Sequence, residues 1–272
     1  MFGRLTPVVK VLLLINIGIF AIGKIFGLHD VIVHYFALRY VNAELFAPFQ
    51  FVTYMFLHGD FYHLLGNMFA LFIFGPALEH LWGPKNFLMY YMICGLGAAI
   101  MFGVIDYAEK SKIENDTSSF IAAPSPDKFS DYVASNIPND GYWYEFFSAA
   151  TSLEPRYYES PNDQGIIQNC KNLVSKFYSI ISNIPMLGAS GAVFGILIGF
   201  GMLFPNTVLV LLFPPIPIKA KYLVAIYAVY EIFYGIRQVP GDNVAHFAHI
   251  GGMLVGFLLI KFWLRAGNKY RY

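Results

Sequence analysis

The sequence predicts an all-α membrane protein with six membrane-spanning helices and a large extracytoplasmic insertion between the third and the fourth. Of the 272 residues, 57% are hydrophobic and 13% are charged, whereas a soluble domain carries roughly a quarter charged residues. The mean hydropathy of +0.54 agrees with a chain that lies mostly in a bilayer. A net charge of +1 gives no support for a nucleic-acid partner.

Six apolar stretches are long enough to cross a bilayer core of about 30 Å, which needs roughly 20 helical residues. They cover residues 7–26, 61–81, 87–107, 186–204, 219–236 and 244–264. Residues 28–60 are apolar and aromatic without helical length, and we expect this first loop to lie half in the membrane, buried against protein. Three prolines break the run 208–218, which favours a segment lying along the interface.

Lysine and arginine in short loops predict that both termini are cytoplasmic, because such residues concentrate on that side. With this orientation the outer loops carry only Lys24, Arg39 and Arg237. The inner side carries Arg4, Lys10, Lys85, Lys219, Lys221, Lys261, Arg265, Lys269 and Arg271.

A polar insertion at 108–183 separates two membrane regions, 1–107 and 184–272, and lies outside the cytoplasm on this topology. Apolar residues recur at helical spacing over 166–181, which predicts one amphipathic helix. The stretch 141–150 is a candidate for a second, shorter helix. We expect the insertion to fold as a small cap that restricts or recruits partners.

Polar side chains lie near the starts of the second, fourth and sixth spans, which all run inward. At 1.5 Å per residue, Ser190 lies about 6 Å, His249 about 8 Å and Asn67 about 9 Å inside the beginning of its span. Polar groups at such depth are costly unless they pair with one another or with water, so each is a functional candidate. This shared depth is the main functional indication of the sequence.

Serine and histidine together form a nucleophile and its base, because a hydroxyl attacks poorly until an imidazole takes its proton. His63 and Asn67 are four residues apart, so they share a helical face and both can donate hydrogen bonds to an oxyanion. Ser190 lies in the first turn of its helix, where free backbone N–H groups favour the same charge. One turn further on, Phe194 can stack on the base.

The sequence directs no carboxylate at His249. Glu79 lies near the inner end of its span, and only Glu231, on the fifth span, has a comparable depth. Nothing in the pattern aims Glu231 at His249, so a Ser190–His249 dyad is the better interpretation.

Structural explanations compete for these residues. A lone serine in a span usually packs or bonds back to its own helix, and a single buried histidine is as often structural as catalytic. We interpret His58 and His246 as structural or supporting, since the minimal mechanism needs neither. Small-residue seams predict close packing of the fourth and sixth spans through Gly191, Gly195, Gly199, Gly252 and Gly256.

Four segments together resemble the rhomboid intramembrane serine proteases. The stretch "GASGAVFG" (188–195) is similar to their Gly-x-Ser-Gly motif, and "HGDFYHLLGNMFAL" (58–71) to their His-x-x-x-Asn signature. The stretch "AHFAHIGGMLVG" (245–256) is similar to their last helix, and "EHLWGPKNFLMYYMICGLGAA" (79–99) to their turn between the second and third spans. These segments occur in the family's order.

The resemblance implies that Ser190 is the nucleophile and that His249, rather than His246, is the general base. It implies an oxyanion hole made by the Ser190 amide with the His63 and Asn67 side chains. The fold it implies is a six-helix bundle with a water-filled cavity that opens outward. The supporting residues implied around the nucleophile and the base are Gly188, Gly191, Phe194 and His246.

The resemblance further implies membrane-anchored protein substrates, cut in or beside their transmembrane segment, and no cofactor or metal. Two features depart from the family: the first loop carries Leu38-Arg39 where many bacterial members carry Trp-Arg, and the insertion replaces a short loop. We expect a plasma membrane location, the inner membrane of a bacterium. The alternatives are an inactive rhomboid-like protein that binds transmembrane clients and a proton-coupled transporter, although a transporter would leave Ser190 and Asn67 unexplained.

Overall fold

The protein is described by a computed structural model that covers residues 5–210, 215–237 and 244–265. These residues are mostly helical, which confirms an all-α fold; the named strands among them are a short antiparallel pair, β1 (Val208–Val210) and β2 (Pro217–Lys219). The helices are α1 (Pro7–Ile25), α2 (His29–Phe36), α3 (Gln50–Thr53), η1 (Tyr54–Phe56), α4 (Phe61–Trp82), α5 (Pro84–Ala122), α6 (Pro126–Asn136), η2 (Gly141–Trp143), α7 (Tyr144–Glu159), α8 (Gln164–Ser182), α9 (Ser190–Leu203), α10 (Ala220–Arg237) and α11 (His246–Arg265).

Within the described residues, four helices are long and apolar enough to cross a membrane: α1, α4, α5 and α11. The fourth expected span is the apolar helix α9, which has only 14 residues. The fifth is α10, whose 18 residues include Lys221, Glu231 and Arg237. A count of six spans therefore stays a prediction.

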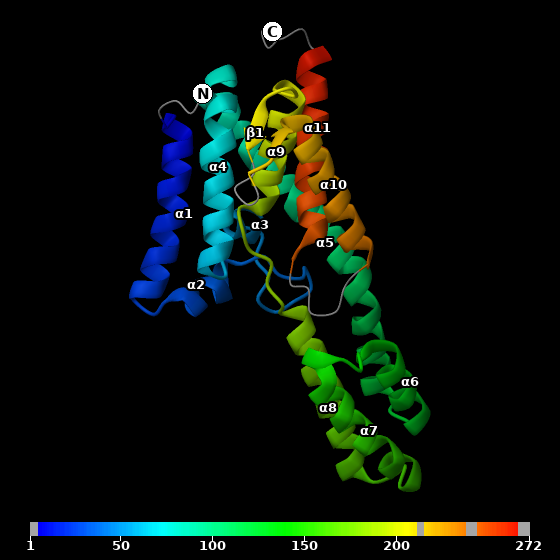
Figure 1. Cartoon of the computed structure of the whole chain (residues 1–272). Helices are drawn as coiled ribbons and strands as arrows, with labels where there is room; N and C mark the ends of the chain where they lie inside the picture. The colour runs from blue at the N-terminus through cyan, green and yellow to red at the C-terminus, as the bar shows by residue number, and fades with distance from the viewer. Residues whose placement is uncertain (1–4, 211–214, 238–243, 266–272) are drawn as a thin grey trace.

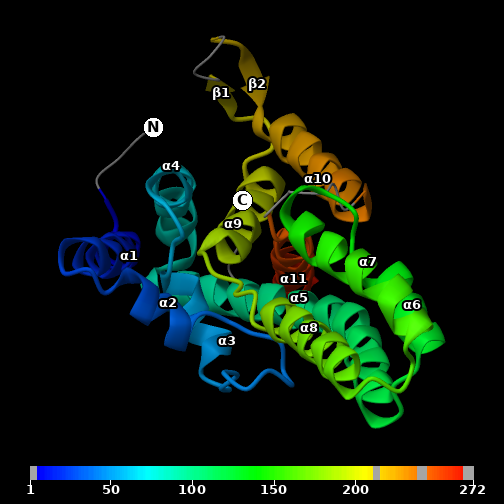
Figure 2. The ribbon, with the colours of Figure 1, turned by 90° about the horizontal axis from the view of Figure 1, so that it is seen from below.

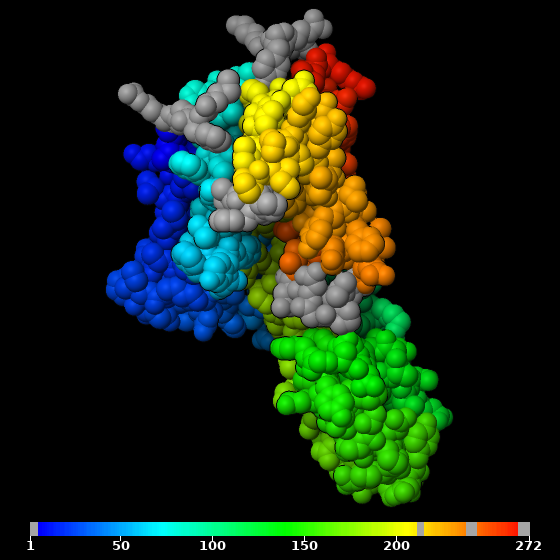
Figure 3. All heavy atoms as spheres, in the orientation of Figure 1, coloured from blue at the N-terminus to red at the C-terminus, as the bar shows by residue number. Residues whose placement is uncertain are grey.

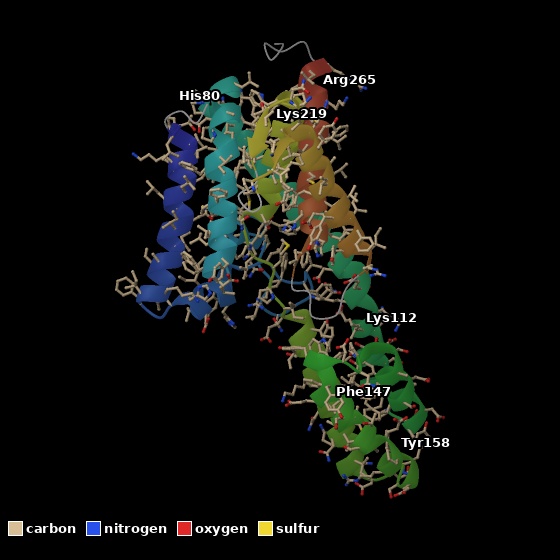
Figure 4. The ribbon with its side chains drawn as sticks, viewed as in Figure 1. His80, Lys112, Phe147, Tyr158, Lys219 and Arg265 are labelled. Carbon is tan, nitrogen blue, oxygen red and sulfur yellow. The ribbon has the colours of Figure 1, made fainter. Side chains whose placement is uncertain are left out.

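The helices α4, α9 and α11 all begin at the end of the bundle that faces the insertion and run the same way (Figure 1). The opposite end carries the start of α1 and the end of α11, and His80, Lys219 and Arg265 lie there (Figure 4). Of the basic residues that predicted the orientation, Arg4, Lys269 and Arg271 fall outside the described residues. The shared direction of the three helices is what the depth argument required.

Glycines allow α9 to meet α11 and α5 at backbone distance. A Cβ on Gly252 would overlap the carbonyl oxygen of Gly191, and a Cβ on Gly191 would overlap Ala98 of α5. One turn further along, a Cβ on Gly256 would lie 3.2 Å from the Cα of Gly195. The small-residue seam between the fourth and sixth spans is therefore confirmed.

The first loop packs against the segment that leads into α9. Leu38 and Met186 exchange backbone hydrogen bonds of 2.9 and 2.8 Å, and the Arg39 guanidinium donates to the carbonyl of Asn183. The Tyr54 carbonyl accepts the N–H of Gly188 at 3.0 Å, while the Tyr54 hydroxyl donates to the Gly95 carbonyl of α5 at 2.7 Å. These bonds hold the chain in place just before Ser190.

The opposite end of the bundle is fixed by a buried carboxylate. Glu79, near the end of α4, accepts the backbone N–H groups of Val8 at 3.0 Å and Val9 at 2.9 Å. These amides belong to the first turn of α1, which has no intrahelical partner for them. Glu79 therefore caps α1 and joins it to α4.

Helix α5 runs from the bundle into the insertion without a break. Its 39 residues span about 58 Å, so the helix continues well past Tyr107, where the third apolar stretch was expected to end. The far end of α5 packs with α6, α7 and α8 around a core of its own (Figure 2), and this part projects from the bundle as a separate lobe (Figure 3). Fully buried members of that core are Phe120, Phe129, Ala150, Tyr157, Cys170, Val174 and Phe177.

The helix predicted at 166–181 is confirmed as α8, with Asp163 capping its N–H groups. The predicted helix at 141–150 is longer than expected, since η2 leads directly into α7, which ends at Glu159. At the base of the insertion, Glu114 of α5 accepts hydrogen bonds from Tyr40 at 2.8 Å and Asn42 at 3.0 Å of the first loop. The insertion is thus tied to the loop that also supports α9.

Candidate active site

Ser190 is the first residue of α9, and its surroundings are set by the preceding glycine. Gly188 has φ of +131°, a conformation that L side chains rarely adopt. A Cβ there would lie 2.7 Å from His63 Nε2 and 3.5 Å from Ser190 Oγ. The missing side chain therefore leaves room for the His63 ring beside the serine hydroxyl.

The hydroxyl of Ser190 is hydrogen-bonded to His249 of α11. The distance from Ser190 Oγ to His249 Nε2 is 2.8 Å, across 59 residues of sequence. Ser190 is half-buried and His249 is buried. This geometry allows the imidazole to take the serine proton.

Two aromatic rings lie against the histidines of α11. Phe194, one turn beyond Ser190, stacks on His249 with ring centroids 4.2 Å apart and planes inclined by 19°. The stacking predicted for Phe194 is thus present. Tyr234 of α10 stacks on His246, with centroids 5.8 Å apart and planes at 26°.

The sequence pattern aimed no carboxylate at His249, but the structure places one beside it. Glu231 of α10 places its Oε2 atom 2.9 Å from His249 Nδ1 and 2.6 Å from His246 Nδ1. The sequence put Glu231 at a suitable depth but could not fix the rotation of α10 about its axis. The structure therefore aligns Ser190, His249 and Glu231 in one hydrogen-bonded chain.

His63 and Asn67 both lie on α4. The His63 ring reaches the Gly188 gap described above, so it lies close to the hydroxyl. Asn67 is buried, and its side-chain amide donates to the carbonyl of His63 at 3.1 Å. The structure thus brings His63 to the serine, whereas the described Asn67 contact is to its own helix.

His58 is a buried side chain just before α4. Its ring centroid is 5.1 Å from that of His63, and neither of its nitrogens has a hydrogen-bond partner among the described residues. Burial, with a further effect of His63, lowers the pKa of His58 to about 3. His58 is therefore neutral, in agreement with a structural or supporting role.

Glu231, His246 and His249 also form the one group, within the described part of the chain, whose spacing suits a metal ion. Their ligand atoms lie within 4.8 Å of one another. In the structure these atoms hydrogen-bond directly to each other. An ion bound there would occupy His249 Nδ1 and displace the Glu231 contact.

A cavity of about 300 Å³ lies on the far side of the histidine pair, between α5, α10 and α11. Its lining includes Asp106, Tyr234, Gly235 and His246, and it does not include Ser190. This cavity is therefore distinct from the outward opening expected at the serine.

Several residues that build the site were not singled out by the sequence. Tyr54 holds Gly188, and Tyr90 of α5 donates its hydroxyl to the Gly195 carbonyl at 2.7 Å. The one sequence signal for Glu231 is its spacing to Gly235, because residues four apart share a helical face, but this spacing does not say which helix that face meets. The tyrosines offered no comparable pattern.

Taken together, the fold and the site define a helical membrane protein with a serine–histidine pair held between its helices. A sequence model of the Rhomboid domain matches residues 46–121 and 164–266. The chain belongs to the rhomboid family. The matched ranges leave out residues 122–163, which lie in the insertion.

Two relatives match most of the chain. An uncharacterized mitochondrial rhomboid protein of Schizosaccharomyces pombe is 27% identical over 250 residues, covering 88% of this chain and 58% of the relative. The mitochondrial RHOMBOID-like protein 12 of Arabidopsis thaliana is 24% identical over 249 residues, covering 91% and 56%. A third, the chloroplastic Rhomboid-like protein 11 of Arabidopsis thaliana, is 34% identical over 95 residues, covering 33% of this chain and 30% of the relative.

This chain therefore spans less than three fifths of the length of each of these relatives. The expectation of a bacterial plasma membrane is wrong, because both relatives that match most of the chain are mitochondrial. With that location, the cytoplasmic assignment of the two termini is also withdrawn.

Proposed function

We propose that this protein is an intramembrane serine endopeptidase in which Ser190 is the nucleophile and His249 the general base. The observation that carries the proposal is the 2.8 Å contact between Ser190 Oγ and His249 Nε2. It joins two helices that both begin at the insertion side of the bundle (Figure 1). Membership of the rhomboid family supports the same reaction.

The chemistry follows from this pair of atoms. The Ser190 proton passes to His249 Nε2 while Oγ bonds to the scissile carbonyl carbon. The peptide C–N bond then breaks, and the leaving amine takes the proton from Nε2. Water, deprotonated by the same nitrogen, attacks the acyl-enzyme and frees the second product.

The oxyanion of each tetrahedral intermediate would be held by the Ser190 amide with the His63 and Asn67 side chains. The Ser190 amide is in the first turn of α9 and has no intrahelical acceptor. The His63 ring lies beside Ser190 in the space left by Gly188. Donors placed in advance at a site shielded from water stabilise developing charge strongly.

The substrates we propose are membrane-anchored proteins that are cut in or beside their transmembrane segment. The enzyme that cuts them is proposed to be a six-helix bundle. The membrane is proposed to be mitochondrial, because both relatives that match most of the chain carry that location in their names. The insertion is proposed to restrict or recruit substrates. Deleting residues 112–180 should change cleavage of several substrates, and unchanged cleavage of all of them would contradict this role.

A fluorophosphonate probe tests the catalytic proposal directly, because it reacts with activated serines. The full chain in detergent or vesicles should be labelled, and Ser190→Ala and His249→Ala should both abolish labelling and cleavage of a transmembrane substrate. His80→Ala, at the other end of α4 (Figure 4), should leave both unchanged. A folded wild type that takes no label would instead favour a rhomboid-like protein that binds clients without cutting them.

A further inference from the structure

Glu231 is the meeting point of two imidazoles inside the bundle. Its Oε2 atom lies 2.6 Å from His246 Nδ1 and 2.9 Å from His249 Nδ1, while His249 Nε2 faces Ser190 at 2.8 Å. The exposed fractions of the three side chains are 4% for Glu231, 7% for His246 and 10% for His249. The carboxylate is thus almost fully withdrawn from solvent.

The direction of these hydrogen bonds follows from the chemistry of the acceptor. An ionised carboxylate only accepts, so both Nδ1 atoms must carry their protons toward Glu231. His249 is then held as the Nδ1–H tautomer, with the lone pair of Nε2 facing Ser190. That is the form in which an imidazole can remove the serine proton.

Glu231 is also one of the few residues that attach α10 to the bundle. The buried residues of α10 are Ala220, Val224, Glu231 and Gly235, and most of its large side chains are exposed. A Cβ on Gly235 would lie 3.3 Å from the Cβ of His246, so this glycine permits the close approach that brings Glu231 to α11. A buried carboxylate is costly inside a membrane protein, and the interface between α10 and the bundle is small. A role in holding His249 explains why Glu231 is nevertheless buried there.

We infer that Glu231 is a positioning residue that completes a Ser190–His249–Glu231 triad, with His246 as the second donor to the carboxylate. Glu231 orients His249, fixes its tautomer and stabilises the imidazolium that forms when the serine proton is taken. This inference rests on the proposed function, since it assigns Glu231 to the same serine and base. It places one member of the triad on each of α9, α10 and α11.

The test compares Glu231→Gln with Glu79→Gln in the full chain. Both substitutions remove a buried carboxylate, but Glu79 binds backbone amides of α1 and lies away from the serine. We expect Glu231→Gln to lower kcat roughly 100-fold or more, as for other triads that lose the carboxylate, with KM changed less than about threefold. Glu79→Gln should leave kcat per folded molecule unchanged.

A second measurement reports on the histidine itself and needs no turnover. With ¹⁵N-labelled histidine, the His249 ring signals are assigned from the spectrum of His249→Ala. The wild type should show the Nδ1–H tautomer, and Glu231→Gln a mixture of tautomers. His246→Asn, which keeps a donor near the position of Nδ1, should retain most of the activity, whereas His246→Phe should lose more.

Each possible outcome decides a separate question. If the wild type is labelled at Ser190 and Glu231→Gln keeps both its kcat and its His249 tautomer, the triad is excluded and the dyad stands. A metal site would give a different set of results. Zn²⁺ would bind the wild type stoichiometrically, inhibit it and fail to bind Glu231→Gln, and the wild type treated with a chelator would show mixed His249 tautomers. If the wild type takes no label, the proposed function fails first, whatever the spectrum shows.

Discussion

Gly188 is the residue on which the space around the nucleophile depends. Its φ of +131° and the 2.7 Å that a Cβ would leave to His63 Nε2 exclude any side chain there. The same residue is held by the Tyr54 carbonyl through its backbone N–H. The backbone conformation of Gly188 and the space for the His63 ring are therefore both set by the residues that precede Ser190.

Gly188→Ala should lower kcat by about 100-fold or more, the scale of losing one oxyanion donor, because the Cβ displaces the His63 ring. The cleavage rate per folded molecule measures this effect. Gly66→Ala is the control, since a Cβ at Gly66 meets nothing within 4 Å. Equal rates for the two variants would contradict the assigned role of His63.

Phe194→Leu should lower kcat up to about tenfold, because a ring stack is worth roughly 0.5–1.5 kcal/mol. The reason is the 4.2 Å stack that restrains the His249 ring. Steady-state cleavage kinetics measure it, with Phe262→Leu as the control, since Phe262 is a 65% exposed ring on α11, the helix of His249. An unchanged kcat in Phe194→Leu would mean that other contacts suffice to hold the base.

At the scale of elements, the contact between α9 and α11 decides whether serine and histidine meet. Gly191 and Gly252 lie at backbone distance, and any side chain on Gly252 would push the helices apart. In a bilayer, such packing replaces the hydrophobic driving force that holds helices together in water. The distance between Ser190 and His249 therefore depends on the glycine contact between α9 and α11.

Gly252→Ala should abolish probe labelling of Ser190, because relief of the overlap must separate α9 from α11. The loss of stability should be at least about 1–3 kcal/mol, the usual cost of overpacking. Labelling of protein recovered by size exclusion separates misplacement from aggregation. Gly18→Ala on α1, where a Cβ meets nothing within 4 Å, should label normally.

The pairing of Ser190 with a histidine of the last span could be predicted because helical rise fixes depth, and the family resemblance then selected His249 over His246. The contact of Glu231 with His249 could not be predicted in this way. Most of the apolar side chains of α10 face outward, as the exposed Ile226, Val229 and Ile236 do. In a membrane helix apolar residues face lipid as readily as protein, so the pattern does not fix the rotation of the helix. The sequence thus specifies the depth of a residue in a membrane helix, but it does not specify the rotation of that helix.

The length of α5 could not be predicted for a related reason. Hydropathy marks where a helix leaves the bilayer, near Tyr107, but a polar helix continues in water when its apolar side packs against others. Here the continuation packs on α6 and α8 in the core of the insertion. The boundary expected at residue 107 marks the end of the apolar stretch, whereas the helix itself ends at Ala122.

At the scale of the whole molecule, the insertion has a core separate from that of the bundle. Phe177→Ala should therefore destabilise the insertion by about 3–5 kcal/mol, as for other buried phenylalanines, and leave Ser190 labelling intact. Limited proteolysis of residues 108–183 measures the first effect and the probe the second. Tyr142→Ala, at a 78% exposed ring, should change neither.

Helix α5 has a mechanical consequence, because it joins the bundle to the insertion as an unbroken helix of about 58 Å. A tilt of the part of α5 that lies in the insertion would be transmitted along the helix to Ala98, which packs against Gly191, the neighbour of Ser190. A force applied to the insertion would thus act on the position of Ser190.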